Sequence, residues 1–297
     1  MKKFTIITSL AVVFLLAVSA ATAQTILREV KRTNEKELSV RITSSFGSVN
    51  VSKGDADHIV KVFYKKKSSD QVPELDLNYS VRNSAGDLQI EMHPEHSTYS
   101  RSKSGEVSVH VNDFNFRTDE WYVSLTDAVP IALEAELGAG KSNFDLSGLH
   151  LTELSIETGA SKSTLAFDSK NKGEIDDLRI ETGVSKFSAE NLNNANFKRL
   201  SFESGVGSYH LDFGGELNRT VDVNINVGLG AVTIVIPKRI GVKVRYEDSW
   251  LSNFSIDDEF IRKRKGTYES DNFDSAEGRM NIFIESGLGS VKVKRSK

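Results

Sequence analysis

The amino-acid sequence predicts an all-β protein whose larger part is a parallel, single-stranded β-solenoid. A Gly-containing phrase recurs about every 22 residues, and apolar and polar residues alternate on both sides of it. This spacing is too short for two strands and a crossover helix, which need about 30 residues. The 297 residues include no Cys and carry a formal net charge of -3. This composition excludes disulfide and thiol chemistry and gives no global basic field for binding nucleic acid.

The first 23 residues are typical of a secretory signal peptide. A positively charged start (MKK) precedes a short apolar run at 10–18, and the sequence ATA at 21–23 provides an A-x-A cleavage site. The apolar run is shorter than the roughly 20 residues that span a bilayer. We therefore expect cleavage after Ala23, no transmembrane anchor in the mature chain, and a periplasmic or extracellular location.

Residues 24–130 are predicted to form an irregular β-rich section. It begins with a degenerate copy of the phrase at 40–51. Alternating apolar residues predict strands at 58–67, 75–83, 86–93, 105–116 and 120–126, and loops at 65–70 and 96–105. The pattern leaves open whether this section is a separate small sandwich or the opening turns of the solenoid.

Residues 131–297 carry the clear repeat. We call the first glycine of each phrase, such as Gly138 or Gly159, the leading glycine. Two residues after this position every copy has Gly or Ser: Gly47, Gly140, Ser161, Ser185, Gly207, Gly230, Ser252 and Gly289. The copy at 246–257 has Trp250 in place of the leading glycine. We expect each coil to pair in parallel with the next one along the chain. Roughly eight coils, about 4.8 Å apart, would then align the small residues at tight corners.

An insert at 258–274 is the longest departure from the repeat. Repeat proteins tend to place such departures on a binding face. Basic and aromatic residues in and near the insert are therefore candidates for contacting a partner protein or an acidic cell-wall glycan: Trp250, Phe254, Phe260, Arg262, Lys263, Arg264, Lys265 and Tyr268. The alternative is a solvated basic loop. End-to-end contact between sheet edges is a further route to an oligomer.

Acidic residues lie two positions before the leading glycine. They are Glu136, Glu157, Glu181, Glu203, Asp248 and Glu285, interrupted by Asn226. Stacked coils would place neighbouring carboxylates about 5 Å apart, the separation found in retaining glycosidases. A glycosidase needs two different environments for its two carboxyl groups, however, and a uniform row offers equal ones.

Three lysines, at positions 141, 162 and 186, lie near enough around the turn to neutralise the first acids of this row. We therefore expect a solvated, lysine-compensated face without catalytic residues or a cofactor. The later coils lack these lysines, so Glu203, Asp248 and Glu285 are the weak candidates for binding a cation such as Ca²⁺.

Several segments resemble the bacterial toast-rack family: LGAGKSNFDLSGL at 137–149, VGLGAVTIVIPK at 227–238, LSNFSID at 251–257 and SGLGSVKV at 286–293. They are also similar to the C-terminal domain of LiaF-like cell-wall-active antibiotic response proteins and to adhesin-like domains of unknown function. The resemblance implies a β-solenoid at the bacterial envelope, with roles in adhesion or in restraining envelope-stress signalling. The chain lacks the N-terminal membrane helices of the LiaF-like proteins, and these families offer no catalytic residues.

These observations predict a noncatalytic envelope protein that acts as a rigid scaffold, an adhesin-like protein or a partner-binding module. The alternative is a polysaccharide-binding or polysaccharide-degrading enzyme, because β-solenoids also host lyases and hydrolases.

Overall fold

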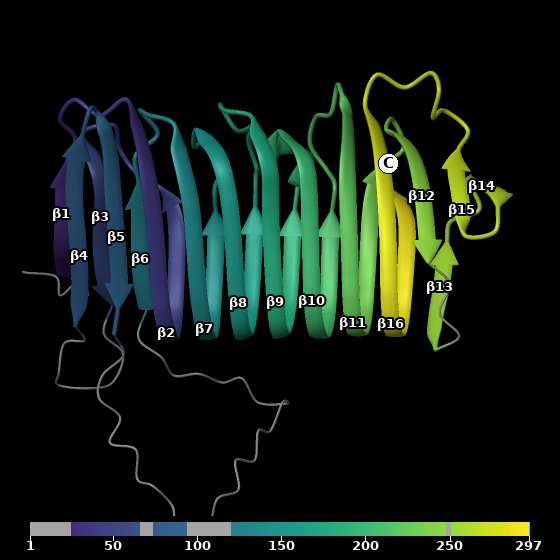
Figure 1. Ribbon diagram of the computed structural model, residues 1–297, viewed down its shortest axis with the longest axis horizontal. Helices are drawn as coiled ribbons and strands as arrows, with labels where there is room; N and C mark the ends of the chain where they lie inside the picture. Colours follow the sequence, from purple (N-terminus) through teal and green to yellow (C-terminus); the bar gives the residue numbers. More distant parts are fainter. Residues whose placement is uncertain (1–24, 66–73, 94–119, 248–250, 297) are drawn as a thin grey trace, which may run out of the picture.

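The computed structural model describes residues 25–65, 74–93, 120–247 and 251–296. In these ranges the chain is almost entirely β, with one short 3-10 helix at Leu192–Ala195. The strands form one sheet of 16 strands, most of them parallel. They lie side by side along the long axis of the molecule (Figure 1).

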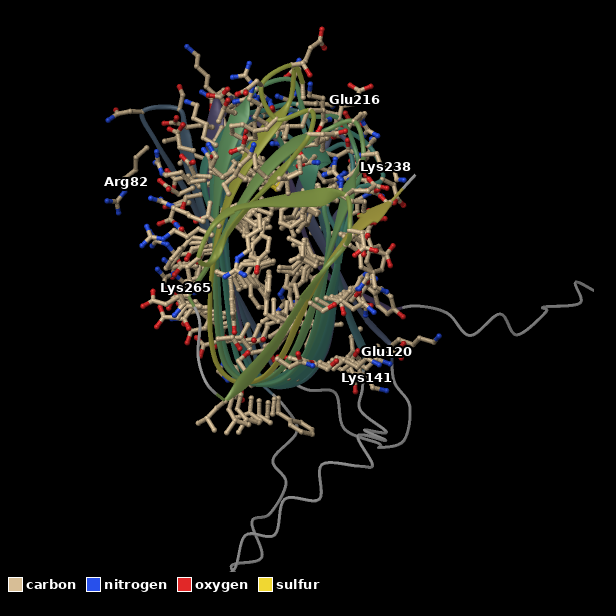
Figure 2. All side chains as sticks on the ribbon, turned by 90° about the vertical axis from the view of Figure 1, so that its right-hand side faces the viewer. Arg82, Glu120, Lys141, Glu216, Lys238 and Lys265 are labelled. Carbon is tan, nitrogen blue, oxygen red and sulfur yellow. The ribbon has the colours of Figure 1, made fainter. Side chains whose placement is uncertain are left out.

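Long strands of 15 to 18 residues make up the centre of the sheet. They are β2 (Glu37–Lys53), β7 (Ile131–Asp145), β8 (Leu151–Ala166), β9 (Ile175–Glu190), β10 (Phe197–Asp212), β11 (Thr220–Pro237) and β16 (Arg279–Ser296). Each of them bends near its middle, so that its two halves lie in two facing walls joined at one edge (Figure 2). The first half of each strand forms what we call the first wall, and the second half forms the second wall.

The predicted column of small residues lies in register across the sheet. Gly47, Gly140, Ser161, Ser185, Gly207, Gly230, Gly289 and Ser252 are successive partners in the parallel ladders. The leading glycines are also closely packed, since a Cβ added to Gly159 would lie 2.5 Å from the carbonyl oxygen of Gly138. Real Cβ atoms do not approach a backbone oxygen so closely, so the bend requires glycine there.

The core fills the space between the two walls. Alternate residues of each long strand point inward, so the six largest fully buried side chains are Phe144, Phe167, Phe187, Phe197, Phe202 and Phe213. The rings of Phe187 and Phe202 lie 5.7 Å apart on neighbouring strands, and Tyr209 packs against Phe202 at 5.4 Å. One bent strand cannot bury its apolar side chains alone, so the sheet is stabilised by contacts between neighbouring strands.

The order of strands corrects one expectation. The repeat copy that follows β11 in the sequence does not pair with β11; the C-terminal strand β16 lies between them. β16 pairs with β11 along its whole length, from Thr220 to Pro237. On its other side it pairs with β12 (Gly241–Glu247) and β13 (Ser252–Ile256). The two short strands β12 and β13 therefore lie on the outer side of the unbroken strand β16.

The N-terminal section continues the same sheet. β5 (Ala85–Met92) pairs with the first half of β2, and β6 (Glu120–Leu125) pairs with the second half. β4 (Leu75–Arg82) then pairs antiparallel with β5, while β3 (His58–Lys65) pairs with β6 and β1 (Thr25–Lys31) pairs with β3. Four of the five predicted strands are thereby confirmed, and the segment at 105–116 lies outside the described residues.

The insert forms a hairpin at the other end of the sheet. β14 (Phe260–Arg264) and β15 (Thr267–Ser270) pair antiparallel, and β15 pairs with β12. Both ends of the sheet thus finish in short antiparallel strands. None of the helices in the described ranges is long and apolar enough to cross a lipid bilayer.

Candidate functional site

The edge where the two walls meet presents three parallel rows of side chains, and we call this surface the bend edge. It consists of the acid, apolar and lysine positions of β7, β8, β9, β10, β11 and β16. The acid row lies at the end of the first wall: Glu136, Glu157, Glu181, Glu203, Asn226 and Glu285 are successive partners in the ladders. These side chains are exposed or partly exposed.

The next member of the acid row is Glu247, which pairs with Glu285. The sequence pattern assigned this place to Asp248, so the predicted position is wrong by one residue. A one-residue difference changes the face of a strand to which a side chain points. Asp248 and Trp250 lie outside the described residues.

The lysine row begins the second wall. Lys141, Lys162 and Lys186 are in register, followed by Ser208, Ala231 and Ser290. Figure 2 shows Lys141 beside the lowest part of the ribbon. The expected neutralisation of the acid row by these lysines is not found among the described residues, because the two rows lie on opposite sides of the bend. Glu136 instead pairs with Arg41, whose guanidinium also contacts Glu134 at 2.7 Å.

The apolar row lies between the other two, at the tip of the bend. It reads Ala139, Ala160, Val184, Val206, Leu229 and Leu288 in the order of the strands. The last four of these side chains are 43 to 46% exposed. Sequence reasoning missed this row, although every copy of the phrase has an apolar residue between its two small positions.

Two of the three cation candidates are separated in the sheet, and the third, Asp248, lies outside the described residues. Asn226 lies between Glu203 and Glu285 in the ladder, so these carboxylates are two strands apart. Asp76, Glu91 and His93 are the group of possible metal ligands found in the described residues, but the two carboxylates are exposed, and the imidazole pairs with both of them. Exposed acidic clusters of this kind are common without an ion.

Oppositely charged residues also alternate across the strands on the outer face of the first wall. The Arg199 guanidinium donates hydrogen bonds to both oxygens of Asp177, at 2.5 and 2.6 Å. This contact lowers the pKa of the Asp177 carboxyl. Asp177 and Arg199 line an open groove with Glu181 and Glu203. The groove therefore contains both signs of charge.

The candidate aromatic residues separate into two groups at the insert end. Phe254 stacks on Tyr246 with ring centroids 4.3 Å apart, and Tyr268 lies 5.3 Å from Phe254. Phe260 is only 7% exposed and packs in the core, beneath the Arg295 guanidinium at 5.3 Å. Phe254 and Tyr268 thus form one partly exposed cluster, and Phe260 serves the packing of the sheet end.

The candidate basic residues lie on the hairpin beside this cluster. Arg262, Lys263 and Arg264 are exposed on β14, and Arg262 is in register with Tyr268. Glu269 pairs with Lys243 at 3.3 Å and with Lys263 at 3.8 Å. Figure 2 places Lys265 on the outer side of the first wall. The structure thus brings the basic run and two of the aromatic residues together.

Comparison with known proteins agrees with the resemblance seen in the sequence. Residues 18–188 and 174–235 match the N-terminal domain of toast_rack, DUF2154. A crystal structure of a candidate cell adhesion protein from Clostridium sporogenes matches at 20% identity and a TM-score of 0.41, covering 92% of this chain and 99% of that one. A candidate adhesin from Bacteroides fragilis matches at 10% identity and a TM-score of 0.31, covering 91% and 98%. No curated protein is significantly similar to the chain.

Proposed function

The chain belongs to the family of toast_rack N-terminal domains, and from this premise we propose that it is a noncatalytic, exported scaffold that binds partners at the cell envelope. The observation that carries the proposal is the in-register repetition of surface groups. Glu157, Glu181 and Glu203 follow one another at the strand spacing of about 4.8 Å. A repeated surface of this kind suits a repetitive or multivalent partner, whose separate weak contacts add up through avidity.

The proposal includes a β-solenoid architecture. The parallel strands β7 to β11 follow each other in chain order, each bends at its glycines, and a connection returns the chain to the start of the next strand. Such a stack with a continuous core is stiff along its axis, because each coil is fixed by its neighbours. Stiffness is what a scaffold requires.

The export part of the proposal rests on the sequence. The residues before Gln24 have the pattern of a cleaved leader, and the chain contains no Cys. It follows that the stability of the exported protein depends on packing and hydrogen bonding alone. A fusion of residues 1–30 to a reporter that is active only outside the cytoplasm tests this part, and a reporter that stays inactive contradicts it.

For the partner we favour an acidic polymer or protein surface that contacts the insert hairpin. The exposed Arg262 is paired in the hairpin with Tyr268, whose ring is partly exposed, and the exposed Lys263 follows it on β14, with its ammonium 3.8 Å from Glu269. This combination suits a polyanion with flat sugar rings, because the charges attract it and the aromatic ring can stack on it.

The test is a pull-down of envelope glycans and proteins with the mature chain and with the double variant Arg262→Glu, Lys263→Glu. Both substitutions are on exposed positions, whereas deletion of 258–274 would also remove the buried Phe260 and Ser270. A matched control replaces Arg199 and Arg179 on the first wall by Glu. Loss of binding in the hairpin variant alone supports the proposal, and binding that persists in that variant contradicts the assigned surface.

The alternative function is glycan hydrolysis on the first wall. Glu157, Glu181, Glu203 and Asn226 line one open groove, with carboxylates on adjacent strands. This separation is close to that of a retaining glycosidase. Turnover of any envelope polysaccharide that disappears in Glu203→Gln would establish the enzyme and overturn the scaffold.

A further inference from the structure

The apolar row of the bend edge is an exposed line of side chains along six consecutive strands. Figure 2 shows side chains made of carbon alone projecting below the point where the two walls meet. Val184, Val206, Leu229 and Leu288 are each more than two fifths exposed. Apolar side chains grouped in one row mark an interaction surface more often than apolar side chains scattered singly.

From β7 to β16 the apolar side chain grows from Ala139 and Ala160 through two valines to Leu229 and Leu288, but on the neighbouring β2 the row continues with Phe46, which pairs with Ala139 and is 39% exposed. The lysine row changes in the opposite sense, because its lysines end with Lys186 on β9. We call β7 to β9 the charged half, because both the acid row and the lysine row are charged there, and β10, β11 and β16 the apolar half, where only the acid row continues, with Glu203 and Glu285.

The charged half carries charged side chains on both sides of the bend. Within the part of the chain that the structure describes, no ion pair engages Glu157, Glu181, Lys162 or Lys186. The carboxylates belong to the first wall and the ammonium groups to the second, so the bend separates them. A binding surface with positive charges opposite the acid row and negative charges opposite the lysine row would form ion pairs with both rows at once.

We propose that this binding surface is a second copy of the chain, with the two bend edges face to face and the two long axes parallel. The two-fold axis then runs along the molecule and exchanges the first and second walls. Glu157 of each copy faces Lys162 of the other, Glu181 faces Lys186, and the leucines of the two apolar halves cover each other. This inference does not depend on the proposed partner at the insert hairpin.

If the two long axes were antiparallel, these ion pairs between the two copies would not form. A two-fold axis across the bend edge keeps the acid rows on the same side, so that Glu181 faces Glu203 and Glu136 faces Glu285. Like charges in direct opposition are unfavourable. The charge pattern across the edge therefore selects the parallel symmetry.

The contact is small. Six strands spaced by about 4.8 Å give an edge of roughly 400 Å² per copy, about half of a standard-size protein interface. We therefore expect a weak dimer with a Kd in the micromolar range or above. Crowding at an envelope surface, or a bivalent ligand, would favour it.

Sedimentation velocity of the chain from Gln24 onward, over a wide range of concentrations, is the first test. The variant Lys162→Glu, Lys186→Glu and the variant Glu157→Lys, Glu181→Lys should each dimerise about tenfold more weakly than the unchanged chain. An equal mixture of the two variants should form a heterodimer, because every charge then meets its opposite. All four positions are on the surface, and circular dichroism confirms that each variant is folded.

The lack of Cys in the chain permits a second test, which reads the direction of the two copies. In the parallel dimer, Ala160→Cys chains should form a disulfide with each other under mild oxidation. A mixture of Ala160→Cys and Leu229→Cys chains should give the mixed product only in the antiparallel dimer. A predominant mixed product overturns the proposal. A monomer at every concentration also overturns it, including the case in which another part of the same chain covers the edge.

Discussion

Gly230 stacks in register on Gly207, and a Cβ added to Gly230 would lie 2.0 Å from the carbonyl oxygen of Gly207. Gly230 also has a φ of +145°, a conformation that residues with a side chain rarely adopt. Two separate physical reasons therefore require glycine at the bend of β11. Two strands away, β9 has Ser185 in the same column and accepts a Cβ there.

We expect Gly230→Ala to lower the free energy of unfolding by about 3 kcal/mol, because it adds backbone strain and a clash with the next strand. Urea denaturation followed by circular dichroism measures this change. Ser185→Ala is the matched control: the Ser185 hydroxyl is buried and has no hydrogen-bond partner in the described structure. The control should leave stability unchanged or raise it. Equal losses in both variants would mean that the bend does not depend on glycine.

A second prediction concerns the turn opposite the bend, where Asn171 is buried between coils. Its side-chain carbonyl accepts the Leu151 N–H at 2.7 Å, and its amide donates to the Leu151 and Ala195 carbonyls at 2.8 and 3.1 Å. Asn171→Ala leaves these backbone groups without partners, so we expect a loss of about 2 to 3 kcal/mol. The melting temperature, measured beside that of Asn143→Ala, checks this. The Asn143 side chain accepts a hydrogen bond from the exposed Thr164 hydroxyl at 2.6 Å, and its loss should cost well under 1 kcal/mol.

The third prediction is a pH dependence that arises at Glu35. Burial raises the pKa of this carboxyl, but hydrogen bonds from the Tyr79 hydroxyl and from the Thr33 hydroxyl and N–H outweigh it and lower the pKa to about 2. In the unfolded chain the pKa is about 4.5. Between these two values the unfolded state binds more protons, so stability is fully present above pH 4.5 and is lost as the pH falls toward 2.

The total contribution is about 3 kcal/mol, of which about 2 kcal/mol is lost between pH 6 and pH 3. This loss is measured as the difference in unfolding free energy between the two pH values. In Glu35→Gln the difference should shrink by that amount, since the amide does not titrate. Asp87→Asn, an exposed carboxyl on β5, controls for the general effect of net charge. An unchanged pH dependence in Glu35→Gln would show that this group does not contribute to acid unfolding.

Most of the central architecture could be predicted from the sequence, because the repeat has a direct physical cause. Residues such as Gly140 and Gly230 must be small wherever one bend stacks on another, so the same small column recurs in each copy. Alternation at Leu200, Phe202 and Leu211 similarly reports which side chains face the core. Membership of the toast-rack family is confirmed over residues 18–235, which include the segment at 137–149 but not those at 251–257 and 286–293.

The features that were missed depend on information that a single copy does not contain. The acid position of β12 is Glu247 because its register is set by β16, and no spacing within 246–257 reveals that. The apolar residue of this row is present in every copy, but its exposure is a consequence of the bend. From its hydrophobicity alone, Val206 would be expected to face the core, whereas the bend places it at the outer tip.

The last prediction follows from the position of β16 in the middle of the sheet. β11 pairs with β16 from Thr220 to Pro237, whereas β12 and β13 each pair with only a shorter segment of β16. Removing residues 279–297 would therefore expose the long, apolar edge of β11 as well as the inner edge of β12. We expect this truncated chain to aggregate and to give no soluble monomer in size-exclusion chromatography, since open strand edges pair with other chains.

Removal of residues 25–31 is the matched control, because β1 pairs only with β3 at the outer end of the sheet. That chain should remain soluble and elute in size-exclusion chromatography like the unchanged chain, with a lower melting temperature. A synthetic peptide of residues 279–296, present during refolding, should restore solubility to the C-terminally truncated chain. If the truncated chain is instead a cooperatively folded monomer, then β12 and β13 can pair directly with β11. The order along the sequence would then suffice to build the stack, and the insertion of β16 would not be needed for folding.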